Sequence, residues 1–358
     1  MLRVLVIDPV AKSRKALGAL LTGETDIVVV SMRETIDGAV REIRIQKPDL
    51  LAIDARALEA DHGAINQIMS ETPLPILLLV DETQSKDDSV VVQALRQGVL
   101  AVLQKPSSHS HPDCAELCGQ IRSLAKIPVV RHPAAARSRR QTPPAMQLSS
   151  LPKQSPGPPR RKVIPEVVGI GSSAGGPQAL TELLSALPCD FPGCVLVVQH
   201  LPRGFASPFA DFLRAGISLP VQLATPGLQM VPGQVILAPD DAHLVVEYKG
   251  YVGLNHTGPV LGHRPSVDKL LLSLAKSYGS AAVGVILSGI GSDGTAGLSA
   301  IREAGGLTFA QTGESSAVNG MPRSASESGA AMFCQHPSAI ADSLRFSFAK
   351  EEVQDGSR

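Results

Sequence analysis

Short apolar runs alternate with amphipathic stretches along residues 1 to 125. The apolar runs are RVLVID, IVVVSM, LLAID, PILLLV and AVLQK, which end at residues 8, 32, 54, 80 and 105. Helical spacing is found over residues 12–21, 35–46, 90–97 and 113–126, and a further loop and helix follow residue 54. Strands that are apolar on both faces and alternate with helices are typical of a doubly wound parallel sheet. The pattern therefore predicts an α/β domain over residues 1–125.

The same alternation returns from Val163 onward. Apolar runs end at residues 171, 200 and 289, and several short β segments lie before Asn255. Helices are predicted from Pro177, from about Gly204, over residues 266–277 and from about Thr295. This half is predicted to be a second doubly wound α/β domain of Rossmann-like type, covering residues 163–348.

A stretch of different composition separates the two halves. Residues 126–162 are rich in proline, contain no acidic residue and carry six arginines, at positions 131, 137, 139, 140, 160 and 161. This composition predicts an extended linker. The basic residues could also bind an acidic partner, but a solvated tether is the simpler interpretation. Residues 349–358 are predicted to form a polar tail.

Composition narrows the functional classes. The chain has 358 residues, is 44% hydrophobic and 18% charged, and has a formal net charge of zero, so no overall field attracts nucleic acid or membrane. Five scattered cysteines are typical of free thiols in a reducing compartment. Neither a secretory start nor an apolar run of roughly 20 residues is present. We expect a soluble, cytoplasmic protein.

Polar side chains follow three strands of the first half. Asp8 and Asp54 end the first and third strands, and Lys105 ends the fifth. Because ligands of doubly wound folds bind beyond the carboxyl ends of the strands, these three residues are expected to converge. Asp8 and Asp54 are candidate Mg²⁺ ligands, and a carboxylate there can accept a phosphoryl group.

The stretch VVGIGSSAGGPQAL, residues 167 to 180, fits two different motifs. Gly169 and Gly171 fit a dinucleotide-binding turn, whereas Gly171-Ser-Ser173-Ala-Gly175 fits a nucleophile elbow. A dinucleotide fold expects an acid at the end of its second strand, to bind the ribose hydroxyls. That strand ends in Gln199-His200 instead, which favours a reacting serine.

A serine nucleophile needs a base within reach and a third group that orients the base. His200 ends one strand and Asp293 lies just past another, so both can meet Ser173 at one sheet edge. The sequence therefore predicts a Ser173-His200-Asp293 triad. Alternatives stay open: the other candidate bases are His243, His256 and His263, and the other candidate acids are Asp240 and Asp268.

The first half resembles a response-regulator receiver domain, which has a flavodoxin-like fold. The resemblance implies phosphorylation of Asp54, with Lys105 contacting the phosphoryl group and Mg²⁺ bound nearby. Receivers usually carry a second acid where this chain has Pro9, and Ser or Thr where it continues Val80-Asp81. We therefore expect a weakened metal site, and Asp8 and Asp54 could equally be relics in a domain that only docks.

The second half resembles the catalytic domain of the chemotaxis methylesterase family CheB. The resemblance rests on GIGSSAGG, QHLPRGF, VILAPDDAHL, HRPSVD, VILSGIGSDG and GMPR, in this order. It assigns the nucleophile, base and orienting acid to Ser173, His200 and Asp293. Two positions near these residues depart from the family pattern, Ala174 for the frequent Thr and Ile290 for the frequent Met.

The resemblance implies hydrolysis of γ-glutamyl methyl esters on chemoreceptors and deamidation of receptor glutamines. The N–H groups of Ala174, Gly175 and Gly176 are candidate oxyanion donors, and the hydrolysis requires no cofactor. The expected partners are methyl-accepting chemotaxis receptors and a histidine kinase that acts as phosphodonor. The protein is expected to be peripheral to the membrane, at receptor arrays, and no nucleic-acid partner is expected. The receiver is expected to lie across the catalytic cleft.

Two other functional classes are compatible with parts of the sequence. A catalytically idle signalling adaptor would keep the fold without turnover, and intact Ser173, His200 and Asp293 argue against it. A nucleotide-dependent oxidoreductase would bind NAD(P) near Gly169 and Gly171, and the missing ribose acid argues against that.

Overall fold

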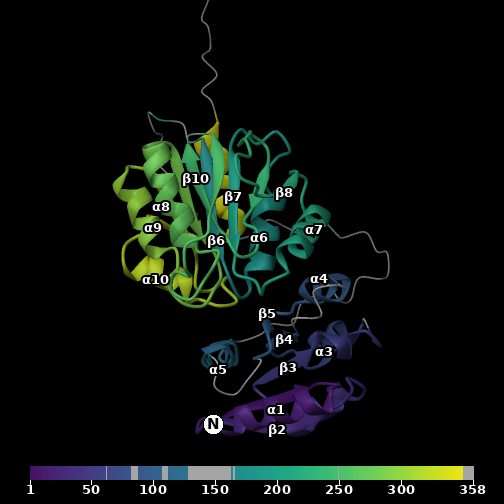
Figure 1. Cartoon of the computed structure of the whole chain (residues 1–358). Helices are drawn as coiled ribbons and strands as arrows, with labels where there is room; N and C mark the ends of the chain where they lie inside the picture. Colours follow the sequence, from purple (N-terminus) through teal and green to yellow (C-terminus); the bar gives the residue numbers. More distant parts are fainter. Residues whose placement is uncertain are drawn as a thin grey trace, which may run out of the picture.

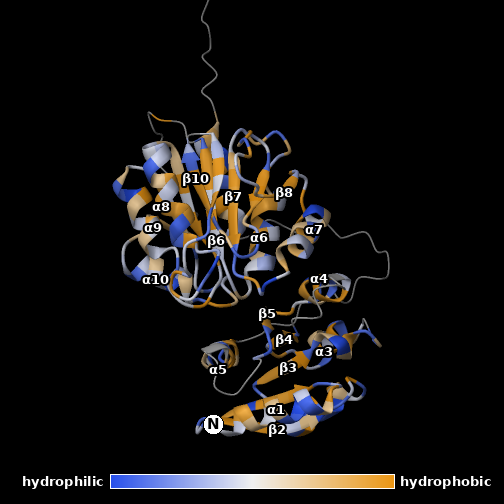
Figure 2. Cartoon of the chain, in the orientation of Figure 1, coloured by the Kyte–Doolittle hydropathy of each residue, from blue (hydrophilic) through white to orange (hydrophobic). Residues whose placement is uncertain are grey.

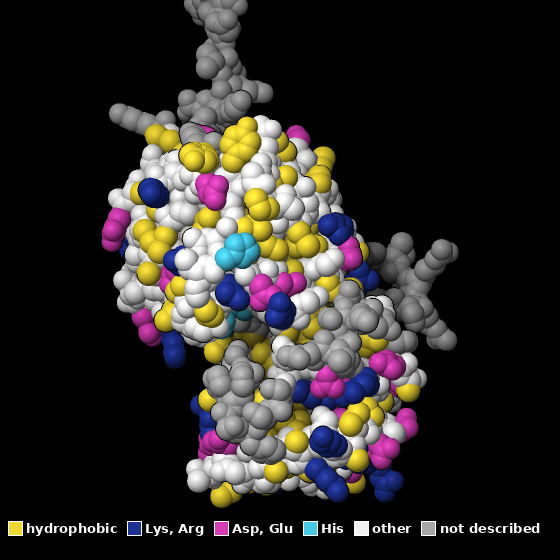
Figure 3. All heavy atoms as spheres, viewed as in Figure 1, with side chains coloured by type: hydrophobic (Ala, Val, Ile, Leu, Met, Phe, Trp, Pro, Cys, Tyr) yellow, Lys and Arg dark blue, Asp and Glu magenta, His cyan; other side chains and the backbone are white. Residues whose placement is uncertain are grey.

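The structure is a computed structural model that describes residues 1–61, 63–81, 88–106, 112–127, 163, 166–248 and 250–349. The predicted linker 126–162 lies outside the described residues apart from its first two positions, and the predicted tail apart from Ala349. Within the described residues, no helix is both long enough and apolar enough to span a membrane. Figure 1 shows two α/β domains, one from each half, and Figure 3 shows charged and apolar side chains interspersed over one face of both.

The N-terminal half is a five-stranded parallel sheet with the order β2-β1-β3-β4-β5. Its strands are β1 (Leu2–Ile7), β2 (Ile27–Arg33), β3 (Leu50–Asp54), β4 (Ile76–Val80) and β5 (Ala101–Gln104). Its helices are α1 (Ala11–Thr22), α2 (Ala39–Gln46), the short η1 (Ala55–Leu58), α3 (Ala64–Glu71), α4 (Asp88–Arg96) and α5 (Pro112–Leu124). This strand order is the flavodoxin-like one, which confirms the predicted fold.

Burial explains why these segments form strands. Every residue of β3 and of β4 is buried, and Figure 2 shows the apolar strands lying inside the layers. The prediction that the second helix begins at Thr35 was wrong, because α2 begins at Ala39. Gly38, just before it, has a φ of 69°, a left-handed conformation that glycine adopts without steric cost.

The C-terminal half is a seven-stranded parallel sheet with the order β14-β13-β12-β6-β7-β9-β8. The strands are β6 (Val167–Ser172), β7 (Cys194–Gln199), β8 (Val221–Leu223), β9 (Val235–Leu237), β12 (Ala282–Ile286), β13 (Leu307–Gln311) and β14 (Phe333–Gln335). The antiparallel hairpin β10 (His243–Tyr248) and β11 (Tyr251–Asn255) lies beside α8. The doubly wound architecture predicted for this half is confirmed.

Helices cover both faces of this sheet (Figure 1). One face packs against α8 (Val267–Tyr278), α9 (Thr295–Glu303) and α10 (Met321–Glu327). The other packs against α6 (Gly176–Ser185), α7 (Ala206–Gly216) and α11 (Pro337–Phe348). From central β6 the sheet continues through β7 on one side and through β12 on the other, so the topological switch point lies between β6 and β12. Ligands of open α/β sheets bind at such a point.

The glycines of β6 allow α8 to pack closely on the sheet. A Cβ atom on Gly169 would lie 2.5 Å from Leu274 Cδ1, and one on Gly171 would lie 2.1 Å from Val267 Cγ1. These contacts show that both glycines serve helix packing at this strand. A dinucleotide is not needed to explain them.

Gly171→Ala is expected to lower the free energy of unfolding by about 1–3 kcal/mol, because the added methyl overpacks the contact with Val267. The measurement is denaturant unfolding followed by circular dichroism. Gly258→Ala is the matched control, since a Cβ at Gly258 meets nothing within 4 Å. Equal stability of both variants would contradict the packing role.

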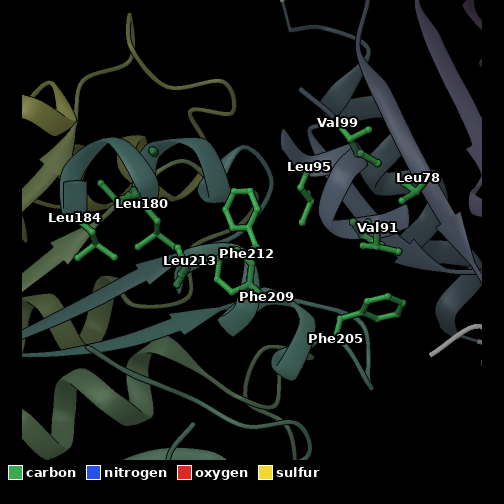
Figure 4. Packing of buried hydrophobic residues seen from close by; sticks show 14 of the residues in the cluster. Leu78, Val91, Leu95, Val99, Leu180, Leu184, Phe205, Phe209, Phe212 and Leu213 are labelled. Atoms are coloured by element: carbon green, nitrogen blue, oxygen red, sulfur yellow. The ribbon is translucent and has the colours of Figure 1, made fainter. Parts of the chain in front are cut away.

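The two halves contact each other through apolar side chains. Leu95 and Val99 of the first half belong to the same buried cluster as Phe205, Phe209 and Phe212 of the second (Figure 4). The side-chain Nε2 of Gln178 donates to the carbonyls of Leu95, at 3.0 Å, and Val99, at 3.1 Å. Gln178 lies on α6, the helix that follows β6, so the carboxyl end of β6 faces the first half.

Candidate active site

Ser173 lies on the turn between β6 and α6. It is 6% exposed, and its backbone N–H donates to the carbonyl of Ser288 at 2.9 Å. Gly175, with a φ of 71°, precedes the first residue of α6. The chain thus reverses sharply from strand to helix at Ser173, as a nucleophile elbow requires.

His200 follows β7 and is bonded to the third predicted residue. Its Nε2 lies 2.9 Å from Asp293 Oδ2, whereas its Nδ1 is buried and has no hydrogen-bond partner among the described residues. Ser173 and His200 line one cavity of about 210 Å³ between the two halves. The structure therefore brings all three predicted residues to one sheet edge. Because Nε2 is bonded to Asp293, Nδ1 is the ring nitrogen that can accept a proton.

The start of α8 holds the Asp293 carboxylate. Oδ1 accepts from Ser266 Oγ at 2.9 Å and from the N–H of Asp268 at 3.0 Å, and Oδ2 accepts from the N–H of Val267 at 2.7 Å. Burial alone raises the pKa of Asp293, but the bond to His200 and these N–H groups outweigh it and lower the pKa to about 2. Asp293 is therefore a fixed anion in the working pH range.

The other candidate bases and acids have different surroundings. His243 is fully buried, accepts from the N–H of Ser266 at Nδ1 and lies 3.1 Å from the carbonyl of Gly258 at Nε2, while His256 is exposed. Asp268 accepts from the N–H of Gly297 at the start of α9. Asp240 is bonded to backbone N–H groups at the start of α7, and burial raises its pKa.

His263 stacks on His200. The ring centroids are 3.8 Å apart and the planes differ by 10°. Burial, and then the neighbouring His200, lower the pKa of His263 to about 4, so its ring is neutral at pH 7. Sequence reasoning considered His263 only as a competing base, and no local pattern indicates ring stacking across the gap from residue 200 to residue 263.

The three candidate oxyanion donors differ in their partners. The N–H of Gly176 donates to the carbonyl of Ser173 at 2.9 Å, so it is already used within the turn. The N–H of Gly175 donates to the carbonyl of Leu100, in the first half, at 2.6 Å. Ala174 lines the cavity, and its carbonyl accepts from Ser288 Oγ at 2.7 Å.

Buried polar side chains that the sequence did not single out fix this turn. Gln199 accepts from Ser172 Oγ at 2.7 Å and donates to the carbonyl of Ser173 at 2.7 Å. Ser288 Oγ accepts from the N–H of Val318 at 2.9 Å. Their position immediately before His200 and after β12 is the only sequence signal that could have indicated them. They tie the nucleophile turn to the two neighbouring strands.

Ile290, the second residue that departs from the family pattern, lies at the contact between the two halves. Ile290 packs, partly buried, against an apolar cluster that includes Ala174 and Val318 of the second half and Leu100 of the first. The two departing residues thus belong to one interface.

In the first half, Asp8, Asp54 and Lys105 converge as predicted. Lys105 Nζ donates to Asp8 Oδ2 at 2.7 Å and contacts Asp54 Oδ2. Arg56 adds a second cation through a bidentate bond to Asp54, with Nε to Oδ1 at 2.9 Å and Nη2 to Oδ2 at 2.8 Å. Among the described residues, no group of three or more His, Cys, Asp or Glu side chains could hold a metal ion. Because the two carboxylates already bind Lys105 and Arg56, the residues do not fit Mg²⁺ as arranged.

Three comparisons with known proteins agree on the family. A family model described as CheB methylesterase matches residues 168–344. The chain is 37% identical to protein-glutamate methylesterase/protein-glutamine glutaminase 3 of Anaeromyxobacter dehalogenans, over 96% of this chain and 98% of that protein. It is 38% identical to the protein of the same name numbered 4 in Myxococcus xanthus, over 90% of each chain.

A solved structure extends this agreement to three dimensions. The crystal structure of the CheB methylesterase catalytic domain of Thermotoga maritima is 37% identical, with a TM-score of 0.50, and the match covers 51% of this chain and 99% of that one. The chain belongs to the CheB methylesterase family and joins a response-regulator receiver fold to a hydrolase of that family.

Proposed function

We propose that this chain removes methyl groups from γ-glutamyl methyl esters on chemotaxis receptors and hydrolyses selected receptor glutamine amides. The observation that carries the proposal is the bond between His200 and Asp293 in the same cleft as Ser173, at the switch point of the sheet. The names of the relatives support both activities. The site of action is the cytoplasmic face of receptor arrays, where a histidine kinase would be the phosphodonor once Arg56 leaves Asp54.

The reaction proceeds through an acyl-enzyme. Ser173 Oγ attacks the ester carbonyl carbon while His200 Nδ1 takes the hydroxyl proton, and His200⁺ then protonates the departing methoxide to release methanol. Water repeats the attack, with His200 as base, and frees the glutamate side chain and Ser173. For glutamine the first leaving group is ammonia. Asp293 keeps a proton on Nε2 in the resting enzyme and stabilises the charged ring.

Backbone N–H groups at the start of α6 stabilise the oxyanion. Ala174 and Gly175 are the candidates, because the N–H of Gly176 is bonded to Ser173 within the turn. Each such donor contributes about 3 kcal/mol to transition-state stabilisation. The N–H of Gly175 becomes available only when the carbonyl of Leu100 leaves it. The first half thus covers the cleft and also occupies an oxyanion donor.

Deletion of residues 1–160 is expected to raise the rate of receptor demethylation severalfold, because it uncovers the cleft and frees the N–H of Gly175. Treatment of the full chain with Mg²⁺ and a phosphodonor is expected to leave the rate close to that of the untreated chain, and so below that of the truncated one, because Arg56 and Lys105 occupy Asp54. Side-by-side initial rates on methylated receptor membranes test both statements. A phosphodonor response as large as that of deletion would contradict the second one.

His263 is a positioning residue for the base in this mechanism. Its stacked ring fixes the plane of His200, so that Nδ1 keeps its direction. His263→Ala is expected to lower kcat about 10²-fold, the cost of a misplaced catalytic group, with KM nearly unchanged. His263→Phe keeps a flat ring and should retain most of kcat. Steady-state kinetics of the two variants decide: equal losses in both would show that an imidazole nitrogen, and not stacking, is required.

The experiment that tests the function itself is methanol release from methylated receptor membranes. Wild-type protein should release methanol, and ammonia from glutamine-bearing receptors, while Ser173→Ala should release neither above background. Release at background by both proteins would favour the idle adaptor.

A further inference from the structure

The acidic site of the first half is closed by cations of the chain itself. Arg56 lies two residues after Asp54, on η1, and its guanidinium bonds both Asp54 oxygens. The same Nη2 lies 2.6 Å from Asp81 Oδ2, at the end of β4. Arg56 therefore joins Asp54, the predicted phosphorylation site, to Asp81.

Counting donors shows how fully these carboxylates are used. A carboxylate offers about four lone-pair positions on its two oxygens. Asp54 Oδ1 accepts from the N–H and Nε of Arg56, and Oδ2 accepts from Nη2 of Arg56 and from Lys105 Nζ. All four positions of Asp54 are therefore occupied. Neither a metal ion nor a phosphorus atom can bond Asp54 without first displacing a donor.

Asp8, the other predicted metal ligand, has little capacity left. Its Oδ1 accepts from the N–H of Val10 at 2.8 Å. Its Oδ2 accepts from Ser13 Oγ at 2.6 Å and from Lys105 Nζ at 2.7 Å. Both oxygens of Asp8 thus have partners as well.

The burial and the net charge of this cluster also oppose the binding of a divalent cation. The side chains of Asp8 and Asp54 are at most 1% exposed and that of Lys105 is 8% exposed, so water screens this cluster weakly. Asp8, Asp54 and Asp81 carry three negative charges, and Lys105 and Arg56 carry two positive charges that offset two of them. A divalent cation would have to enter a site whose net charge is already close to neutral, against two resident cations.

We propose that Arg56 takes the place of the divalent cation in this receiver, so that the full chain binds no Mg²⁺ at Asp8 and Asp54 and Asp54 accepts no phosphoryl group while Arg56 is bonded to it. The proposal does not depend on the hydrolase activity. The arginine supplies the positive charge that holds the carboxylates together, since its Nη2 binds both Asp54 and Asp81. The receiver then remains in one state when Mg²⁺ and a phosphodonor are supplied.

The test compares full-length wild type, Arg56→Met and Arg44→Met. Arg44 is the matched control, because its guanidinium also bonds a carboxylate, Glu71 at 2.6 Å, but on the exposed surface. The probes are MgCl₂ at millimolar concentration in isothermal titration, and radiolabelled acetyl phosphate with Mg²⁺ for covalent labelling. Circular dichroism melts verify folding, and Arg56→Gln is run in parallel in case the Met variant does not fold.

Wild type and Arg44→Met should show neither Mg²⁺ binding nor label. Arg56→Met should bind Mg²⁺ and take up label about tenfold or more above the background measured with wild type, since each charged donor removed from a carboxylate is worth about that factor. Asp54→Asn added to Arg56→Met should abolish the label. Two results would overturn the proposal: wild type that binds Mg²⁺ and labels as strongly as Arg56→Met, or a folded Arg56→Met that still binds no Mg²⁺.

Discussion

His200→Ala is expected to lower kcat for receptor demethylation by about 10⁶-fold, the loss found when the base of a serine triad is removed. His200 Nδ1 has no hydrogen-bond partner among the described residues, so it can accept the proton of Ser173. The neighbouring His263 has a pKa lowered to about 4, which makes it a poor base. Folding should be retained, because the side chain lies at a cleft. The measurements are kcat on methylated receptor membranes and the melting temperature.

His256→Ala is the control for this prediction, since His256 is exposed on the surface. It should leave kcat unchanged. If His200→Ala keeps kcat within about tenfold of wild type, the assigned base is wrong, because general acid–base catalysis contributes about 10²–10⁴-fold even alone.

Asp293→Asn is expected to lower kcat by about 10⁴-fold. An amide can stabilise the wrong tautomer of His200, and Asp293 accepts from Ser266, Val267 and Asp268 as well. An Asn NH₂ group would face some of these donors, so we also expect a loss of stability of about 1–3 kcal/mol. Kinetics and denaturant unfolding measure the two effects separately.

The stability that wild type has over Asp293→Asn is expected to fall as the pH falls. The folded pKa of Asp293, about 2, is below the ordinary 3.8, so its stabilising contribution is complete above pH 3.8 and is lost as pH falls through 2. The stability difference between wild type and Asp293→Asn should shrink over that window.

Asp240→Asn is the comparison for activity: if it abolishes kcat while Asp293→Asn does not, Asp240 and not Asp293 orients the base.

Strand-end reasoning predicted much of the site. Ser173, His200 and Asp293 each follow an apolar strand, and parallel strands bring their carboxyl ends to one edge, so periodicity alone brought these residues together. The role of Gly169 and Gly171 could not be decided in this way. Their space is filled by Leu274 and Val267 of α8, about a hundred residues away, and only the folded chain shows that contact.

The contact of Arg56 with Asp54 and the stacking of His263 on His200 were missed for related physical reasons. The strand pattern points only to the last residue of each strand, and Arg56 lies two positions past Asp54, where η1 turns its side chain back onto the carboxylate. An arginine two residues after a buried strand-end aspartate is the signal that could have indicated it. His263 follows Gly262, which has a φ of 85°, and its stacking depends on a loop conformation that no periodicity encodes.

Methanol release from methylated receptor membranes, measured for wild type and Ser173→Ala at equal concentration, decides whether Ser173 is the nucleophile of a methylesterase. Wild type should release methanol, and Ser173→Ala should be about 10⁶-fold slower with an unchanged melting temperature. Methanol release by a folded Ser173→Ala at the wild-type rate would rule out Ser173 as the nucleophile.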